Sequence, residues 1–278
     1  MRLDTVIPNF KANTTLGPID FYDFQGDSRM TVLKHNEDST NLKSLREVPD
    51  ETEGDSKSVE LIKFKLGQDA DWNTSTCNGQ ILFYFRWVVL FSHPADFTPV
   101  CTTELGRMAV HDGEFKKRNV KLLALSCDKM QSHIDWVNDI KSYCPDIKTD
   151  FPYPIIGDET RELAVLLDMI SENDRNNPEL AMTVRALYII SPEHKLKLAM
   201  IYPTSTGRNV DEILRCIDSL QLCARVKVVA TPANWTPGTK VMILPHVKDE
   251  DLPKLFPRGV DKVSMPSGIN YVRTTTDY

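Results

Sequence analysis

The chain has 278 residues, of which 41% are hydrophobic and 26% charged, the balance of a globular protein rather than a disordered or collagen-like one. Its 33 basic residues against 39 acidic ones give a formal net charge of −6, so no basic excess indicates a dedicated nucleic-acid binder. The most apolar stretch, residues 81–91, contains Arg86 and is too short to cross a bilayer. We therefore expect no transmembrane segment and, without a signal-peptide pattern, a cytoplasmic location.

The first quarter of the chain contains two different kinds of sequence. Residues 6–27 mix short apolar runs with Pro and Gly, which predicts short strands and turns. Residues 34–57 then carry seven acidic and four basic side chains and few apolar ones, which predicts a solvated, disordered excursion. A polar stretch, 67–80, continues this segment up to the apolar run Ile81–Phe85.

From residue 87 onward, patterns typical of strands and helices alternate. In chain order we expect a strand at 87–92, a helix at 99–118, a strand at 120–126, a helix at 129–143, a strand at 151–156, a helix at 158–169, a hairpin of 184–190 with 195–202, and a helix at 209–222. Such alternation predicts an α/β fold built around a sheet. Beyond about residue 226 the chain is punctuated by Pro and Gly, which indicates a small second domain.

The segment from His93 to Glu104 reads HPADFTPVCTTE and joins a predicted strand to a predicted helix. Cys101 should therefore lie in the first helical turn, where unpaired backbone N–H groups and the positive end of the helix dipole favour a thiolate. Thr98 precedes it by three residues, close enough for its hydroxyl to reach the sulfur or a bound oxygen. From this context alone, a reactive thiolate and an inert buried thiol fit equally well, and His93 fits a structural role better than a catalytic one.

The six cysteines include no CxxC pair, which argues against a zinc site and against a dithiol oxidoreductase of the thioredoxin type. We expect no metal and no bound cofactor. Four of the cysteines occupy a strand end, a position before proline or one face of a helix, and we expect structural roles for them: Cys127, Cys144, Cys216 and Cys223.

The spacing Pro94-x3-Thr98-x2-Cys101 within LFSHPADFTPVCTTELGR resembles the active-site signature of the peroxiredoxins, specifically their one-cysteine, peroxiredoxin-6 type. The segments NVKLLALSCD, KLKLAMIYPTSTGRNVDEILRCIDSLQL and VATPANWTPG extend the resemblance to nearly everything except about residues 29–86. It implies an α/β thioredoxin-like fold, with a central mixed sheet flanked by helices and a small C-terminal domain. The implied peroxidase domain is 5–225, interrupted by 29–86, and the C-terminal domain is 226–278.

The resemblance also implies a thiol peroxidase that reduces hydrogen peroxide and organic or phospholipid hydroperoxides, in antioxidant defence. Cys101 matches the nucleophile that becomes a sulfenic acid. A lone arginine in an apolar strand is by itself better explained as half of a structural ion pair, but Arg185 matches the active-site arginine of the family. Arg185 would hold the thiolate and polarise the peroxide, while Thr98 would donate or accept a hydrogen bond at the same site.

Three further residues receive supporting roles from the resemblance. Pro94 would wall the pocket and limit water, His93 would border the sulfur, and Glu104 would orient the arginine. No cysteine lies in the context of a resolving cysteine, so the expected cycle uses one cysteine and an external thiol reductant. The resemblance indicates glutathione delivered by a glutathione transferase partner, and a homodimer.

Mammalian relatives also carry a serine-based phospholipase site, from which this sequence departs. Ser28 is present, but the second glycine of its Gly-x-Ser-x-Gly motif is absent. Tyr22 occupies the position of the histidine and Glu193 that of the aspartate, and a tyrosine cannot relay a proton near neutral pH as imidazole does. We therefore expect no lipase activity.

The segment 29–86 has no counterpart in the family. It is either a genuine surface loop or a retained intron translated in frame, and the apolar run 81–86 favours the intron. It enters ahead of the strand 87–92, which spans about 20 Å, so Cys101 should lie beyond the far end of that strand and its chemistry should survive. The alternative function is a non-catalytic chaperone or interaction protein whose site the insertion has misassembled.

Overall fold

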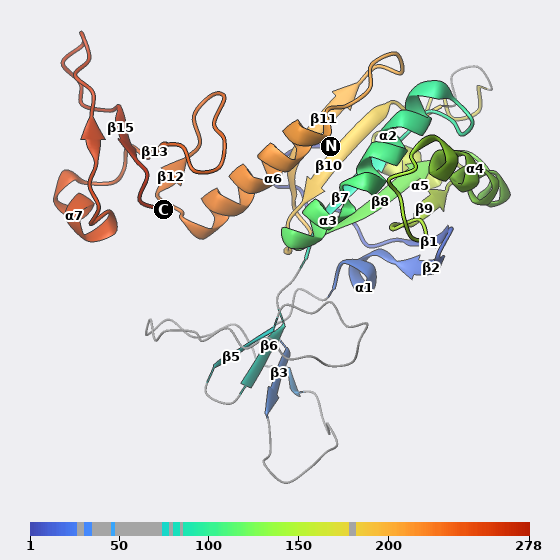
Figure 1. The fold of residues 1–278 in the computed structure, drawn as a ribbon, viewed down its shortest axis with the longest axis horizontal. Coiled ribbons are helices and arrows are strands. Elements are labelled where there is room, and N and C mark those ends of the chain that lie inside the picture. Colours follow the sequence, from blue (N-terminus) through green and yellow to red (C-terminus); the bar gives the residue numbers. More distant parts are fainter. Residues whose placement is uncertain (27–30, 35–45, 48–73, 78–79, 84–85, 178–181) are drawn as a thin grey trace. The chain divides into compact units, whose positions relative to one another are not determined.

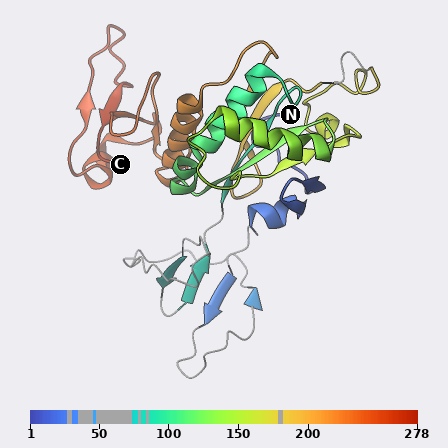
Figure 2. The same cartoon turned by 45° about the vertical axis from the view of Figure 1, so that its right-hand side comes forward.

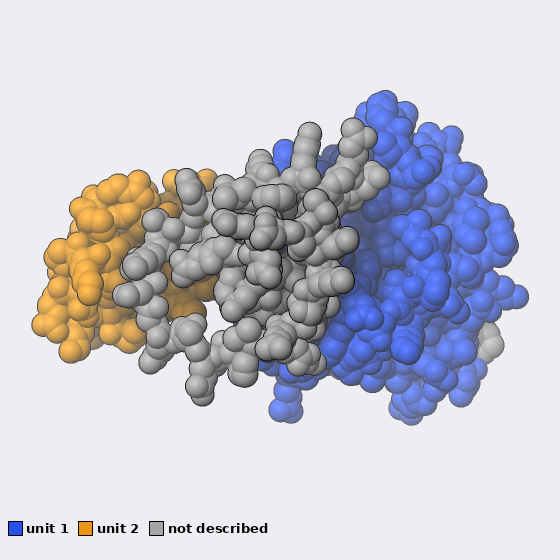
Figure 3. All heavy atoms as spheres, turned by 90° about the horizontal axis from the view of Figure 1, so that it is seen from below, with its two compact units in different colours: residues 1–207 blue, residues 208–278 orange. Residues whose placement is uncertain are grey.

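The computed structural model describes residues 1–26, 86–177 and 182–278, together with the backbone of four short strands between residues 31 and 83. The chain divides into two compact units, residues 1–207 and residues 208–278, which Figure 3 shows in different colours. Among these described residues, every helix is either too short or too polar to span a membrane.

The first unit is built on a seven-stranded sheet with the strand order β11-β10-β7-β8-β9-β1-β2 (Figure 1). Its elements are β1 (Lys11–Thr14), β2 (Gly17–Asp20), α1 (Phe21–Gln25), β7 (Trp87–Ser92), α2 (Pro99–Val110), α3 (Asp112–Lys117), β8 (Val120–Ser126), α4 (Met130–Tyr143), β9 (Ile155–Gly157), α5 (Glu162–Leu166), β10 (Arg185–Ile190) and β11 (Leu196–Tyr202). Strands β7, β8 and β9 run parallel, and the other neighbours are antiparallel. The predicted mixed sheet of a thioredoxin-like α/β fold is confirmed.

The centre of the sheet is its most buried part. Strand β7 pairs with β10 on one side and β8 on the other, and all six of its residues are buried. This position explains why its sequence, WVVLFS, is continuously apolar up to the last residue. Each large apolar side chain buried there stabilises the folded state by roughly 1.5–3 kcal/mol relative to an exposed one. The core therefore holds rigid the strand whose end leads to Cys101.

Helices α2 and α4 lie side by side along the sheet (Figures 1 and 2). Gly106 of α2 permits this approach, because a Cβ at that position would overlap Cys144 Sγ and would lie 3.5 Å from Ile140 Cγ2. The close contact fixes α2, and with it Cys101, against α4.

Two predicted helices differ from the observed ones. The helix expected over 99–118 is divided at His111, which ends α2 and precedes α3. The helix expected over 158–169 is reduced to α5, because Arg161 adopts a left-handed conformation with φ 61°. The Asp158 carboxylate instead accepts a hydrogen bond from Ala164 N at 2.7 Å. The strand expected at 151–156 is observed three residues long, as β9.

Within the segment 29–86, the described backbone forms a small antiparallel sheet with the strand order β4-β3-β6-β5. These strands are β3 (Thr31–Lys34), β4 (Arg46–Glu47), β5 (Thr74–Cys77) and β6 (Gln80–Phe83). The expected disorder of the remaining positions concerns residues outside those described. The Gln25 side chain donates to Arg86 O at 2.8 Å, so the residues on the two sides of this segment meet beside the start of β7.

The second unit consists of α6 (Val210–Arg225), a short 3-10 helix (Asp249–Asp251), α7 (Leu252–Leu255) and a sheet of β12 (Val229–Ala230), β13 (Val241–Ile243), β15 (Arg273–Thr275) and β14 (Asp261–Lys262) in that order. Asn209 caps α6, its side chain accepting a hydrogen bond from Glu212 N at 3.2 Å. Leu222 of α6 packs into the small core around Trp235. The division between the units therefore falls before α6, whereas the domain boundary expected at 225/226 falls after it.

Candidate active site

Cys101 is the third residue of α2 and is completely buried. Pro99 occupies the first helical position, where its missing N–H and fixed φ suit the start of a helix. The Thr98 hydroxyl does not cap the helix but donates to Ala95 O at 2.8 Å. The sulfur therefore lies in the first turn, at the positive end of the helix dipole, as the sequence predicted.

Arg185 begins β10 and places its guanidinium against α2. Its Nη1 lies 3.4 Å from Cys101 Sγ and 2.6 Å from Glu104 Oε2. On the other side, Nε and Nη2 both donate to Thr204 O, at 3.0 and 2.7 Å. Cys101 and Glu104 are three residues apart in α2 and so present their side chains on the same face. One arginine thus joins the helix, the strand and the segment after β11.

This group can support nucleophilic chemistry at sulfur. Arg185 is 2% exposed, and the adjacent Glu104 carboxylate and Thr204 carbonyl compensate the cost of burying its charge. A fixed guanidinium N–H beside the sulfur is a donor that a thiolate accepts strongly. The same cation can offset negative charge on an oxygen that departs from the sulfur.

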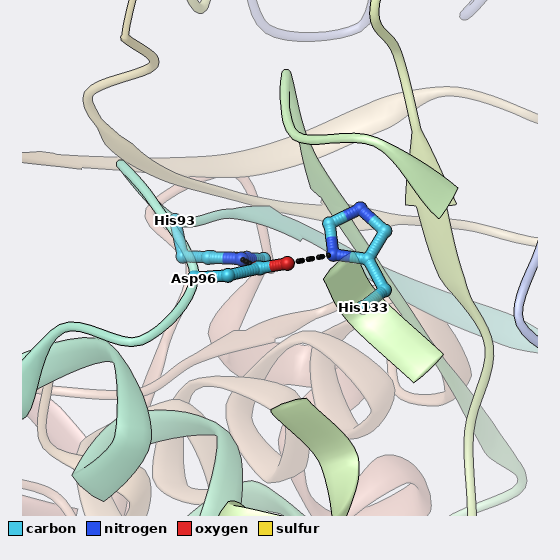
Figure 4. A group of neighbouring side chains, drawn as sticks. All are labelled: His93, Asp96 and His133. Atoms are coloured by element: carbon cyan, nitrogen blue, oxygen red, sulfur yellow. Dashed lines mark hydrogen bonds and ion pairs between the residues drawn. The ribbon is translucent and has the colours of Figure 1, made fainter. Parts of the chain in front are cut away.

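In the loop between β7 and α2, His93 and Asp96 form a second cluster with His133 of α4 (Figure 4). His93 Nε2 lies 2.8 Å from Asp96 Oδ1, and His133 Nδ1 lies 2.7 Å from Asp96 Oδ2. Burial would raise the pKa of the Asp96 carboxyl, but its contacts with His133 and His93 outweigh burial and hold that pKa well below its usual range. Burial lowers the pKa of His93 despite the nearby carboxylate. The cluster ties the loop to α4.

Residues of these types also bind metals, but the spacing of His93, Asp96 and His133 differs from that of a metal site. Two ligands of a tetrahedral zinc ion, each about 2.1 Å from the metal, lie roughly 3.4 Å apart. The observed contacts of 2.7 and 2.8 Å are those of atoms in direct contact. The geometry therefore fits a directly bonded network rather than a metal site.

Of the residues predicted from the sequence, Cys101, Glu104 and Arg185 meet directly. Pro94 is buried in the loop. In the described structure neither ring nitrogen of His93 is hydrogen bonded to the sulfur: Nε2 contacts Asp96, and Nδ1 has no hydrogen-bond partner. No hydrogen bond therefore supports the expectation that His93 borders the sulfur.

The sequence reasoning missed several residues that position this site. Ser92 and Thr183 bond the backbone around Arg185 and His93, and a polar residue ending an apolar strand was the available signal for Ser92. Asp96 and His133 were missed because only the fold brings them together. Thr204 acts through its backbone carbonyl, for which a sequence contains no signal.

The five cysteines whose side chains are described are all free. Burial raises the pKa of Cys127 to about 12 and that of Cys216 to about 11, the latter with a contribution from Glu212. Burial also raises the pKa of Cys144. These three thiols stay protonated at neutral pH and are poor nucleophiles, in keeping with the structural roles expected for them.

A thioredoxin-like sheet with a buried cysteine at the start of a helix, in contact with an arginine from a neighbouring strand, fits the class of thiol-dependent peroxidases. Two family models match the chain: the AhpC/TSA family over residues 59–199, and the C-terminal domain of 1-Cys peroxiredoxin over residues 219–256. Human Peroxiredoxin-6 is 41% identical over 276 residues, which cover 99% of this chain and 97% of the human one. Chicken Peroxiredoxin-6 is 49% identical over 216 residues, or 76% and 96% of the two chains.

Solved structures agree with these relatives. The crystal structure of a cysteine-to-serine mutant of Peroxiredoxin 6 from Arenicola marina has a TM-score of 0.74 and 41% identity, and the match covers 100% of this chain and 99% of that one. The structure of a yeast mitochondrial 1-Cys peroxiredoxin has a TM-score of 0.70 and 34% identity, and the match covers 99% of each chain. The chain belongs to the one-cysteine peroxiredoxins of the peroxiredoxin-6 type. It is accordingly a thiol peroxidase with a one-cysteine mechanism.

Proposed function

We propose that Cys101 is the cysteine that reacts with peroxide. The contact between its sulfur and the Arg185 guanidinium, at 3.4 Å in a buried site, carries this assignment. The thiolate attacks one oxygen of ROOH, an S–O bond forms and the O–O bond breaks. The sulfur loses two electrons and becomes a sulfenic acid, while RO⁻ takes up a proton and leaves as ROH.

Four neighbouring residues assist this step. Arg185 stabilises the thiolate and the departing oxygen, and Glu104 orients Arg185. The Thr98 hydroxyl donates its hydrogen bond to Ala95 O, so its oxygen is left to accept a hydrogen bond from the hydroperoxide O–H. Pro94 walls the pocket against water.

The sulfenic acid is reduced by an external thiol, for which we propose glutathione. One thiol displaces water to form a mixed disulfide with Cys101, and a second thiol releases the cysteine. Cys127, which is half-buried, and Cys216, which is buried, both stay protonated and are poorly suited to resolve it internally. The yeast relative resolves its thiol through glutathione/thioredoxin systems. A glutathione transferase is the proposed partner that delivers the glutathione.

The proposed substrates are hydrogen peroxide and organic hydroperoxides, phospholipid hydroperoxides included, and the proposed assembly is a homodimer in the cytoplasm. These proposals follow from the likeness to Peroxiredoxin-6 and from the free state of the described cysteines.

We propose no serine-based lipase activity. Tyr22, at the position of the family's histidine, donates its hydroxyl to Ile7 O at 2.7 Å and stacks on His194. Burial raises its pKa, which leaves it still less able to act as a base at neutral pH. Glu193 accepts a hydrogen bond from Ser191 at 2.6 Å. Ser28 lies outside the described residues.

Peroxide consumption by the full chain tests the assignment. With glutathione as reductant, Cys101→Ser should abolish turnover, and Cys127→Ser, the matched control, should retain it within about twofold. Arms with glutathione plus a glutathione transferase, and with thioredoxin, identify the reductant. Turnover by Cys101→Ser at the wild-type rate would refute the role of Cys101, and failure of both glutathione arms would refute the proposed reductant.

A further inference from the structure

The backbone around Arg185 lies just beyond the end of a strand pairing. Strand β10 pairs with β7 from Ile190, opposite Val88, back to Leu187, opposite Phe91. Arg185 precedes this ladder by two residues, so the backbone pairing with β7 does not reach it. On the side that faces β7, the backbone of Arg185 must therefore be held by interactions other than strand pairing.

The Ser92 hydroxyl supplies that connection. It donates to Val184 O at 2.5 Å and accepts from Ala186 N at 3.1 Å, so one buried hydroxyl bonds the backbone on both sides of Arg185. Thr183 adds a second tie, because its hydroxyl donates to His93 O at 2.7 Å. Side chains thus continue the junction of β7 and β10 where the ladder stops.

This junction joins the two halves of the site. Ser92 is the last residue of β7 and leads into the loop that ends at α2 and Cys101, while Val184 and Ala186 flank Arg185. A guanidinium lies several ångströms from its own Cα, so a small rotation of that backbone moves it away from the sulfur. A misplacement of about 1 Å in a reacting site can cost on the order of 100-fold in rate.

We propose that Ser92 is a positioning residue for the peroxidase reaction, whose hydroxyl fixes the backbone of Arg185 so that the guanidinium meets Cys101. Ser92 acts through Arg185 and does not touch the substrate. The inference rests on the proposed roles of Cys101 and Arg185. It predicts that the loss of one hydroxyl lowers both the reactivity of the sulfur and the fraction of it that is ionised.

The test compares Ser92→Ala with Tyr188→Phe in the full chain. Tyr188 is a matched control because it lies in β10, the strand that Arg185 begins, and its buried hydroxyl donates to Leu167 O at 2.7 Å, away from Arg185. For each variant we would measure the rate of Cys101 oxidation by hydrogen peroxide, the thiolate fraction at neutral pH from its ultraviolet absorbance, and the urea midpoint of unfolding.

Ser92→Ala should slow oxidation by about tenfold or more and lower the thiolate fraction, whereas Tyr188→Phe should keep both within about twofold while its unfolding midpoint falls. If Ser92→Ala changes only the midpoint, as the control does, the serine is merely structural and the inference is wrong. Should Ser92→Ala not fold, Thr183→Val removes the adjoining tie and must slow oxidation for the inference to stand.

Arg185→Ala, measured beside them, separates this inference from the proposed function. If Cys101 is oxidised at the wild-type rate in Arg185→Ala, the role of the arginine itself is refuted. If oxidation is slow in Arg185→Ala but occurs at the wild-type rate in Ser92→Ala, only the positioning role of the serine is refuted.

Discussion

At the scale of single residues, the site depends on how one arginine distributes its donors. Arg185 reaches the sulfur and Glu104 with Nη1 and the Thr204 carbonyl with Nε and Nη2, so its planar fork is held from two directions. The sequence could indicate this residue, because a cation in an apolar strand needs a use or a partner. It could not indicate the Thr204 carbonyl, which only the fold brings to the arginine.

Replacing Arg185 by lysine keeps the positive charge but removes the fork. A single ammonium cannot contact the sulfur, Glu104 and the Thr204 carbonyl in the same geometry, so oxidation of Cys101 by peroxide should slow by roughly 10²–10³-fold. Stopped-flow measurement of that oxidation checks the prediction, with Arg175→Lys, outside the site, as the control. A lysine variant as fast as the wild type would mean that charge alone suffices.

At the scale of elements, the sequence predicted best where burial alone decides. Strands 87–92 and 120–126 are observed as β7 and β8 with the expected bounds, because continuous apolar runs between two neighbours allow little else. The helix predicted at 158–169 was wrong in extent, because Arg161 takes a left-handed conformation that propensity does not indicate. The joining of β7 and β10 by Ser92 depends on register, which one sequence does not contain.

The contact of α2 with α4 gives a prediction at this scale. Gly106→Ala should lower the free energy of unfolding by about 1–3 kcal/mol, since the new methyl group overlaps Cys144 Sγ. Gly113→Ala is the control, because it adds a methyl group to α3 with nothing within 4 Å and should be neutral or stabilising by up to about 1 kcal/mol. Urea unfolding measures both. Equal effects of the two substitutions would contradict the proposed close packing, and relief of the loss by Cys144→Ala would support it.

At the scale of the whole molecule, the thioredoxin-like fold, the family and the one-cysteine mechanism were all expected from the sequence and are confirmed. They were accessible because the resemblance extends over most of the chain. The small sheet of β3 to β6 was not expected, since its strands are short and lie in a mainly polar segment. Gln25 and Arg86, which flank this segment, are hydrogen bonded to each other at the opposite end of β7 from Ser92, and this explains how the site coexists with so long a segment.

The most direct test of the account is to locate the first oxidation on the full chain. One equivalent of hydrogen peroxide is added to the reduced protein, the sulfenic acid is trapped with a dimedone-type reagent, and the labelled peptide is identified by mass spectrometry. The account predicts that the label appears on Cys101 alone, far faster than on an ordinary free thiol, and that Arg185→Ala slows it. A label spread over several cysteines, or a rate at Cys101 no higher than that of an ordinary thiol, would contradict it.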